Sequence, residues 1–283
     1  MSFASIPSIT AQEIADRYDV VLLDSYGVLV HAGGPLPGAA AMLERLRRRG
    51  RAYFVVTNDA SRLPGTSADR FVRFGLDVRA EQVITSGSLL APYFAREGLG
   101  GARCMVLGPK DSRAYVAAAG GVVVPPDVAA GYDALVVCDD AGYPFLDTVD
   151  VAISALYRHF DRGDDVRLIC PNPDLVYPKG ENEYGFTSGG VALLLEAALR
   201  RRYPERDLAF ARLGKPHPPM FEEALRRAGE GRAIMIGDQL ETDVAGARRA
   251  GIDAALVTTG VTRTAALHPD APCAPTYLLD RLQ

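Results

Sequence analysis

Short apolar runs alternate along this chain with longer stretches in which apolar residues recur every three or four positions. Such runs are typical of strands buried in a parallel sheet, and the recurring positions indicate amphipathic helices. The expected strands are Val20–Leu23, Tyr53–Val56, Cys104–Leu107, Val122–Val124, Ala134–Cys138, Arg167–Cys170, Leu208–Arg212, Ala233–Ile236 and Ala254–Val257. The expected helices are Ala39–Arg49, Ser67–Phe74, Ser88–Arg96, Ser112–Ala119, Asp147–Phe160, Val191–Arg202, Pro218–Ala228 and Asp243–Ala250. This alternation predicts an α/β fold with a doubly wound parallel sheet.

One long segment does not follow this pattern. Residues Pro171–Gly190 include Pro, Asn, Asp and Gly without periodicity, which predicts a long loop. Loops of this length within a compact domain are often functional, so we expect this one to contribute to a site. The shorter segment His31–Gly38, after the first strand, is also expected to be a loop.

Composition and charge restrict the possible functions. The chain has 283 residues, 48% hydrophobic and 23% charged, with a net charge of −4. It is long enough for one large domain or two ordinary ones, each with a real core. The clusters Arg47–Arg49 and Arg200–Arg202 fall at expected helix ends, where cations are favourable, so we expect no nucleic-acid partner.

The expected location of the protein is the cytoplasm. The sequence has no apolar run long enough to span a bilayer and no secretory signal, so we expect no membrane association. The four cysteines lack CxxC spacing, and three of them lie in or at the end of expected strands. Reduced core thiols are therefore favoured over zinc ligands or disulfides.

Side chains of compatible chemistry follow four of the expected strands, namely Asp24, Thr57 with Asn58, Lys215, and Asp238 with Asp243. Because the carboxyl ends of parallel strands share one edge, where open α/β sheets bind ligands, these groups are expected to converge. Carboxylates can hold Mg²⁺, whereas a hydroxyl, backbone N–H groups and an ammonium can hold phosphate oxygens. Each of these groups alone is also typical of a turn or a helix cap. Only their combination predicts phosphoryl transfer.

In these motifs the chain resembles the haloacid-dehalogenase-like (HAD) hydrolase superfamily, and within it the NagD-type branch of phosphatases, subfamily IIA. The resemblance extends over nearly the whole chain, from about Asp19 to Arg263. It implies a Rossmann-like core formed by residues 1–100 and 207–283. It also implies an inserted α/β cap domain formed by residues 101–206.

The resemblance implies a phosphoric monoester hydrolase that acts through an aspartyl phosphate. Asp24 matches the family's nucleophile, Thr57 its phosphate-binding hydroxyl and Lys215 its charge-neutralising ammonium. The positions implied to bind substrate or phosphate are Asn58, Asn172 and Asp174.

The implied cofactor is Mg²⁺. Its ligands would be Asp24, the backbone carbonyl of Tyr26 and Asp238. Asp243 would orient Lys215 or the waters of the metal from behind these ligands.

Tyr26 departs from the family pattern, which usually has a second Asp two residues after the nucleophile. That Asp protonates the leaving group and later activates water. A phenol with a pKa of about 10 is a poor base at neutral pH, and loss of general acid–base help costs about 10²–10⁴ in rate. The carbonyl of residue 26 would still be present, so metal binding is compatible with the change.

Three interpretations of this departure stay open. The chain is a slow phosphatase, or it recruits another acid–base group from the set Asp59, His217, Asp140 and Asp174. Alternatively, it is a non-hydrolytic phosphate-ligand-binding protein or another phosphotransfer catalyst. A receiver-like domain shares the strand-end Asp, but the large cap argues against it.

The expected partner is a small phosphorylated metabolite such as a sugar phosphate or a nucleotide. Its identity depends on the shape of the loop Pro171–Gly190 at the cap. The resemblance also implies a homodimer formed through the cap.

Overall fold

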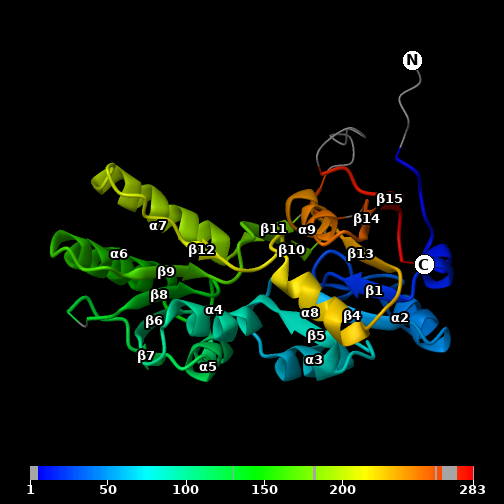
Figure 1. Cartoon of the computed structure of the whole chain (residues 1–283), viewed down its shortest axis with the longest axis horizontal. Helices are drawn as coiled ribbons and strands as arrows, with labels where there is room; N and C mark the ends of the chain where they lie inside the picture. Colours follow the sequence, from blue (N-terminus) through cyan, green and yellow to red (C-terminus); the bar gives the residue numbers. More distant parts are fainter. Residues whose placement is uncertain (1–5, 130, 181–182, 259, 263–272, 283) are drawn as a thin grey trace, which may run out of the picture.

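The computed structural model describes residues 6–129, 131–180, 183–258, 260–262 and 273–282. Figure 1 shows two lobes side by side, each built on its own sheet. The first sheet has six parallel strands in the order β15-β14-β13-β1-β4-β5. Their bounds are β1 Val20–Leu23, β4 Ala52–Thr57, β5 Val83–Thr85, β13 Ala233–Gly237, β14 Asp253–Val257 and β15 Tyr277–Leu279.

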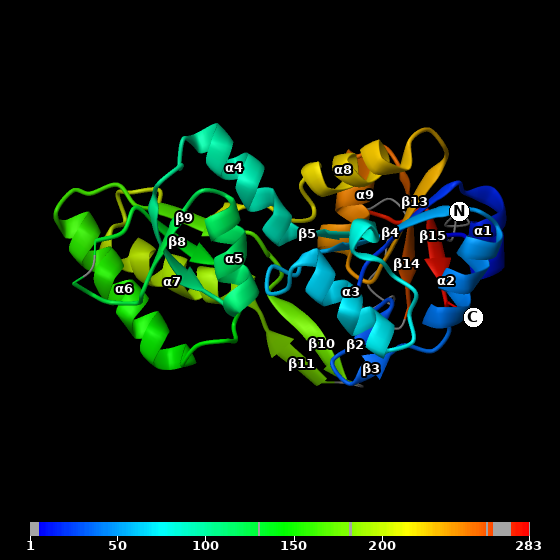
Figure 2. The same ribbon diagram turned by 90° about the horizontal axis from the view of Figure 1, so that it is seen from below.

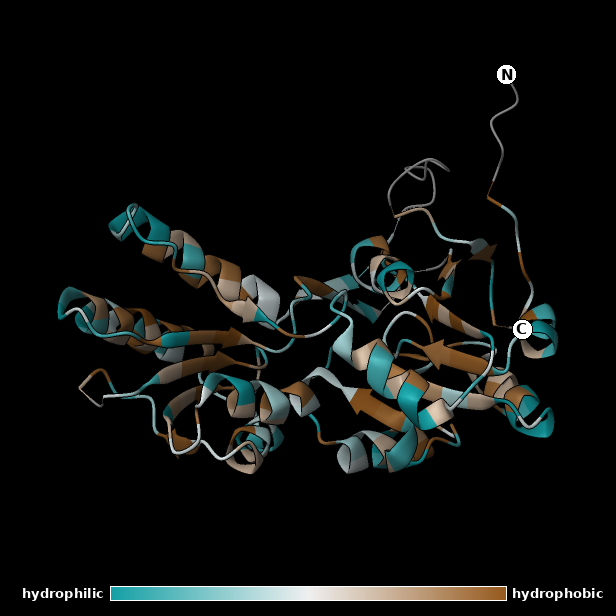
Figure 3. Cartoon of the chain, viewed as in Figure 1, coloured by the Kyte–Doolittle hydropathy of each residue, from teal (hydrophilic) through white to brown (hydrophobic). Residues whose placement is uncertain are grey.

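Helices cover both faces of this first sheet. One face packs against α1 (Ala11–Arg17), α2 (Ala39–Arg48) and α3 (Pro64–Arg73). The other face packs against α8 (Pro219–Ala228) and α9 (Ala245–Arg249). This confirms the predicted doubly wound α/β fold, and Figure 3 shows apolar strands between helices with polar outer faces.

The second sheet has five parallel strands in the order β12-β9-β8-β6-β7. Their bounds are β6 Arg103–Leu107, β7 Val122–Val124, β8 Ala134–Val137, β9 Arg167–Cys170 and β12 Ala211–Arg212. Helices α6 (Phe145–Asp161) and α7 (Ser188–Arg202) pack on one face. Helices α4 (Leu90–Glu97) and α5 (Lys110–Ala118) pack on the other.

The division into a core and a cap at residues 100 and 207 stays a prediction. Both α4 and β12 lie outside the range 101–206, yet they pack with the second sheet. The strand predicted at Leu208–Arg212 is observed only as β12, which is shorter than predicted, and β12 belongs to the second sheet.

The prediction that residues Pro171–Gly190 form a long loop was wrong. It contains the antiparallel hairpin of β10 (Val176–Gly180) and β11 (Glu183–Phe186), and α7 already begins at Ser188. The hairpin strands are largely half-buried or exposed, so they show no apolar run. Figure 2 shows this hairpin between the lobes, next to the short hairpin of β2 (Val30–His31) and β3 (Gly34–Pro35).

Several elements were not expected from the pattern, namely α1, β5, β15, the β2–β3 hairpin, the 3-10 turns Ala80–Gln82 and Ser86–Leu89, and the π turn Leu240–Val244. Helix α1 has a clear signal in retrospect, because Thr10 and Glu13 form a capping box around its first turn. Among the described residues, no helix combines the length and the apolarity that crossing a bilayer requires.

Candidate active site

Three neighbouring strands bring the predicted side chains to one edge of the first sheet. β1 pairs in parallel with β4 on one side and with β13 on the other. Asp24 follows β1, Thr57 ends β4, and Asp238 follows β13. The convergence expected for the carboxyl ends of parallel strands is therefore present in the structure.

Lys215 lies within a cluster of buried carboxylates at this edge. Its side chain is 1% exposed, and its Nζ lies 2.8 Å from Asp24 Oδ1 and 2.6 Å from Asp243 Oδ1. Burial alone lowers the pKa of this ammonium, but Asp24 and Asp243 together raise it above its ordinary value. Lys215 is therefore a permanent cation that neutralises part of the buried negative charge.

Asp24 is held beside this cation. Its Oδ1 also accepts a hydrogen bond from the backbone N–H of Ser25 at 2.7 Å. Burial raises the pKa of the Asp24 carboxyl to about 7, while Lys215 lowers it and Asp243 raises it. A divalent cation next to Asp24 would favour the ionised form, which is the form that acts as a nucleophile or a ligand.

Asp238 has an oxygen that fits a metal ligand. Its side chain is fully buried, and Oδ2 accepts the N–H of Val261 at 2.9 Å. Oδ1 is buried without a hydrogen-bond partner among the described residues. A buried carboxylate oxygen without a partner is costly, and coordination of a cation would remove that cost. Asp24 and Asp238 also approach closely enough to share an ion, since one ligand atom from each lies within 4.8 Å of the other.

Asp243 lies within the same 4.8 Å group, but both of its oxygens already have partners. Oδ1 accepts from Lys215 Nζ, and Oδ2 accepts the N–H groups of Asp238 and Gln239 at 3.1 and 3.2 Å. Its geometry suits a residue that positions Lys215 and the loop after β13. The turn needs Gly237, because a Cβ there would overlap the Asp243 carboxylate.

The loop after Asp24 packs closely against Asp238. Gly27 has a positive φ of 80°, and a Cβ at this position would overlap the Asp238 carboxylate. The backbone of Tyr26 and Gly27 is thereby kept next to Asp238. This supports the proposal that the carbonyl of Tyr26 belongs to the metal site.

Asn58 connects the loop of Lys215 to the end of β4. Its Oδ1 accepts the N–H of Lys215 at 2.7 Å, and its Nδ2 donates to the carbonyl of Lys215 at 3.2 Å. Thr57, beside it, is buried, and its Oγ1 accepts the N–H of Asp59 at 3.2 Å. No acceptor for the hydroxyl hydrogen of Thr57 is present among the described residues, so the hydroxyl can donate to a ligand.

The second lobe reaches the same place through Asp174. Its Oδ1 accepts a hydrogen bond of 2.8 Å from Asn58 Nδ2 across the junction of the lobes. Burial raises the pKa of Asp174 to about 6, although Lys215 and the Asn58 amide lower it. Asn172 shapes this loop, since its Oδ1 accepts the N–H of Asp174 at 3.0 Å and its Nδ2 donates to Thr187 at 3.2 Å.

Comparisons with known proteins agree with this arrangement. A family model described as "Haloacid dehalogenase-like hydrolase" matches residues 21–121, and a second HAD-hydrolase-like model matches residues 212–283. Chronophin from Bos taurus is 31% identical over 263 residues, which cover 88% of this chain and 84% of chronophin.

The chain belongs to the haloacid dehalogenase-like hydrolases.

Solved structures place it in the same family. A possible sugar phosphatase of the HAD superfamily from Cytophaga hutchinsonii aligns with a TM-score of 0.84 and 29% identity, covering 98% of this chain and 99% of its own. A glycerol phosphate phosphatase from Mycobacterium tuberculosis, solved in complex with magnesium, aligns with a TM-score of 0.76 and 28% identity. That alignment covers 95% of this chain and 77% of the relative. The predicted NagD-type branch and the predicted enzyme class, a phosphomonoester hydrolase, are thereby confirmed.

In this hydrolase Asp24 borders a cavity of about 150 Å³ between the two lobes. From the first lobe it is lined by Asp24, Tyr26, Thr57, Asp59, Ser61, Arg62 and Gln239. From the second it is lined by Cys138, Asp139, Asp140, Ala141, Asn172, Asp174, Tyr177, Pro178 and Thr187. Nearly all of the predicted catalytic and binding side chains therefore lie in or directly beneath one cavity.

Tyr26 forms an aromatic contact between the lobes. Its ring lies edge-on to the ring of Tyr177 in β10, with centroids 5.6 Å apart and an angle of 76°. The guanidinium of Arg70 lies 5.0 Å from the centroid of the Tyr26 ring. The side chain at this position is therefore held by packing and a cation–π contact.

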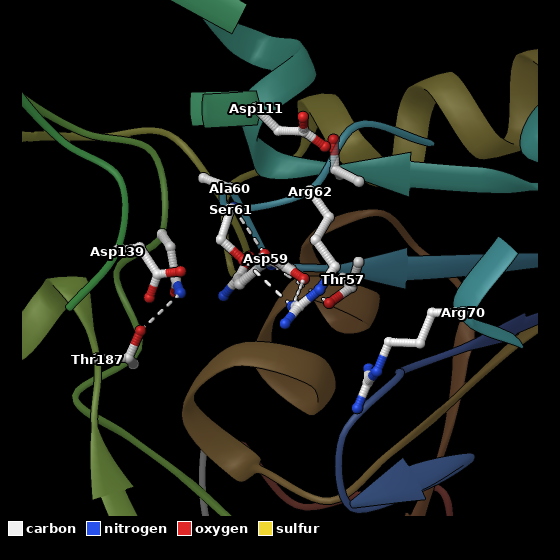
Figure 4. A network of polar contacts seen from close by, with 12 residues as sticks. Thr57, Asp59, Ala60, Ser61, Arg62, Arg70, Asp111, Asp139 and Thr187 are labelled. Atoms are coloured by element: carbon white, nitrogen blue, oxygen red, sulfur yellow. Dashed lines mark hydrogen bonds and ion pairs between the residues drawn. The ribbon is translucent and has the colours of Figure 1, made fainter. Parts of the chain in front are cut away.

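Two of the groups considered as recruited acid–base residues are poorly placed for this work. His217 is exposed and does not line the cavity. Asp59 lines it, but Oδ1 accepts from the Ser61 N–H and hydroxyl and Oδ2 pairs with Arg62 at 2.8 Å, as Figure 4 shows.

Two residues of the cavity, Arg62 and Asp139, were not predicted from the sequence. Arg62 contributes a cation to the lining, and its signal in the sequence is its position four residues after Asn58. Asp139 directly follows β8, where an aspartate is typical of a turn, and it lines the cavity on the side of the second lobe.

Proposed function

We propose that this hydrolase removes phosphate from a small phosphomonoester through an aspartyl phosphate on Asp24, with Mg²⁺ as its cofactor. The observation that supports this most directly is the buried group of Asp24, Lys215 and Asp238. It combines a carboxylate nucleophile, an adjacent ammonium, and a carboxylate oxygen without a partner in the described part of the chain. The magnesium complex of the mycobacterial relative supports the choice of metal.

In this proposal Asp24 attacks the phosphorus as the ester bond breaks, and the phosphoryl group passes to its carboxylate. Thr57 donates its free hydroxyl hydrogen to a phosphoryl oxygen, and the N–H of Asn58 donates to another. Lys215 neutralises charge on Asp24 and on the phosphoryl group. When bound by Asp24, the carbonyl of Tyr26 and Asp238, Mg²⁺ supplies electrostatic stabilisation of the transferring group.

The cavity restricts the substrate. A cavity of about 150 Å³ suits a phosphoryl group with a small leaving group, such as a triose or a glycerol unit. Asn172 and Asp174 would contact the substrate from the second lobe. Access to this space depends on the β10–β11 hairpin, whose Tyr177 contacts Tyr26.

Tyr26 cannot supply the acid–base carboxyl that usually stands at this position. The side chain has no carboxyl group, and its ring is engaged by Tyr177 and Arg70. Without another acid in the site, turnover of an alkyl phosphate would be lower by about 10²–10⁴ than with an Asp at this position, the usual contribution of general acid–base catalysis. In that case the Tyr26→Asp variant should raise this turnover accordingly, and no gain would indicate that another group serves as the acid.

Two further parts of the proposal concern location and assembly. Free cysteines at all four positions fit a reducing compartment such as the cytoplasm. Exposed leucines on the second lobe, Leu146 on α6 and Leu194 on α7, fit a homodimer formed through this lobe.

The test is phosphate release from a panel of phosphomonoesters, including p-nitrophenyl phosphate and glycerol 3-phosphate, with Mg²⁺ or with EDTA. The proposal predicts turnover with Mg²⁺ only, and its loss in Asp24→Asn. Tight binding of an ester without turnover under any metal condition would instead favour a phosphate-ligand-binding protein.

A further inference from the structure

Departure of an alkoxide from phosphorus requires a proton donor, because an alkoxide is a poor leaving group in water. Besides Asp24, four aspartates line the cavity, namely Asp59, Asp139, Asp140 and Asp174. A useful donor must carry a proton near neutral pH and reach the leaving oxygen. The surroundings of Asp59, Asp174 and Asp139 show which of these three is best placed.

Asp59 and Asp174 already have partners for their carboxyl oxygens. Asp59 accepts hydrogen bonds from Ser61 on one oxygen and pairs with Arg62 on the other. Asp174 accepts from the Asn58 amide at 2.8 Å and lies near the Lys215 ammonium. These contacts hold both side chains in place at the junction of the lobes.

Asp139 has the opposite surroundings. Its Oδ1 accepts one hydrogen bond, from the N–H of Asp140 at 2.8 Å, and no cation pairs with it among the described residues. Burial, together with the neighbouring carboxyls of Asp140 and Asp59, raises the pKa of the Asp139 carboxyl to about 7. The other charged or titratable groups near it are Arg62, the Tyr177 phenol, the Cys138 thiol and the Tyr143 phenol, which donates to the Asp139 carbonyl at 2.9 Å.

Backbone hydrogen bonds hold Asp139 at a fixed place in the fold. It follows β8 directly, and the N–H groups of Cys138 and Asp139 both donate to the carbonyl of Leu107 in β6, at 2.8 and 3.2 Å. Figure 4 shows Asp139 on the side of the second lobe, with Asp59, Arg62 and Thr57 across from it on the first. A leaving group that projects away from Asp24 and Thr57 enters the space between these two sides.

We propose that Asp139 is the general acid of this enzyme and donates its proton to the leaving oxygen. As Asp24 forms its bond to phosphorus, the ester P–O bond breaks, the leaving oxygen takes the Asp139 proton, and a neutral alcohol departs. Water then attacks the phosphorus of the aspartyl phosphate and gives its proton to solvent, which releases inorganic phosphate and frees Asp24, and Asp139 takes up a proton from solvent again. The inference rests on the proposed phosphatase function and assigns the role of general acid to the second lobe.

Tyr26 is the rival donor, since its hydroxyl-bearing side chain lines the same cavity. Its hydroxyl lies on a ring already held between Tyr177 and Arg70. The Tyr26→Phe variant removes this hydroxyl and leaves the backbone carbonyl in place, so it separates the two donors.

The experiment compares leaving groups. p-Nitrophenolate is a good leaving group and departs without taking up a proton. The glycerol alkoxide is a poor leaving group and must be protonated as it departs. A general acid therefore matters only for glycerol 3-phosphate. In Asp139→Asn, which keeps the acceptor for the Asp140 N–H, we expect kcat for glycerol 3-phosphate to fall by about 10²-fold or more. Turnover of p-nitrophenyl phosphate should fall less than about threefold, which also shows that the variant is folded. The exposed Asp150→Asn on α6 is the matched control and should leave both rates unchanged.

Each outcome decides the matter. A selective loss in Asp139→Asn, with little change in Tyr26→Phe, supports the assignment. Equal losses on both esters, no loss on either, or a larger selective loss in Tyr26→Phe would overturn it. Wild-type protein without Mg²⁺-dependent turnover of either ester would refute the underlying phosphatase function instead, and this result differs from all of the others.

Discussion

Removal of the buried ammonium of Lys215 tests the electrostatics of the site without an activity assay. Lys215→Met keeps most of the side-chain volume but removes the charge between Asp24 and Asp243. Two contacts are lost, at 2.8 and 2.6 Å, and both carboxylates stay buried. The variant therefore creates uncompensated negative charge in the centre of the first lobe.

The expected cost follows from these contacts. A hydrogen bond to a charged group contributes about 1.5–3 kcal/mol, and removal of one partner from a buried ion pair costs about 3–5 kcal/mol. Part of this cost is relieved because Asp24 and Asp243 can each take up a proton. We therefore expect the free energy of unfolding of the metal-free protein to fall by about 3 kcal/mol at neutral pH.

Urea unfolding followed by circular dichroism in EDTA measures this difference. Lys110→Met, at an exposed position at the start of α5, is the matched control and should change stability by less than about 0.5 kcal/mol. Lys215→Met/Asp243→Asn should recover part of the loss, because one of the two stranded carboxylates is then neutral. A loss below about 1 kcal/mol in Lys215→Met would refute the reasoning, since it would mean that the three groups do not form a buried charge cluster.

Three further predictions concern the surroundings of the site. Gly27→Ala should abolish Mg²⁺-dependent turnover, because a Cβ there overlaps Asp238, whereas Gly75→Ala, with a similar φ of 74° and open space around it, should cost only about 1–2 kcal/mol of stability. Retained turnover in Gly27→Ala would contradict the close approach of this loop. Asn58→Ala should lower stability by about 1–3 kcal/mol, since the N–H of Lys215 loses its acceptor; an unchanged urea midpoint would argue against the link between the loops. Because burial raises the pKa of Asp139 from 3.8 to about 7, the folded state binds more protons than the unfolded state between these values. Stability from this group is therefore present at pH 4 and is lost as the pH rises to 7, so the melting temperature of Asp139→Asn relative to wild type should increase over this range. A constant difference would show that the Asp139 carboxyl is not perturbed.

The elements predicted best are those whose signal is local. β1 and β13 are buried on both faces, so they stand out as apolar runs, and a polar residue directly after each run marks the edge of the sheet. Helix α2 was predicted within one residue of its observed end because its apolar positions repeat along one face.

The features that were missed depend on contacts between distant parts of the chain. The β10–β11 hairpin is not enclosed in either core, so its strands show no apolar run. Asn58 and Asp174 are 116 residues apart, and their hydrogen bond depends on how the second lobe packs against the first. The place of Asp139 in the cavity has the same origin, since its local sequence is that of an ordinary turn after a strand.

Trapping of the phosphorylated enzyme tests the central claim most directly. The protein is mixed with p-nitrophenyl phosphate and Mg²⁺, quenched in acid during turnover, digested, and mapped by mass spectrometry. The account predicts one added phosphoryl group on the peptide that contains Asp24, and none on the same peptide from Asp24→Asn or from a reaction in EDTA. Turnover with a phosphoryl group on another residue, or with Asp24→Asn as active as the wild type, would contradict it.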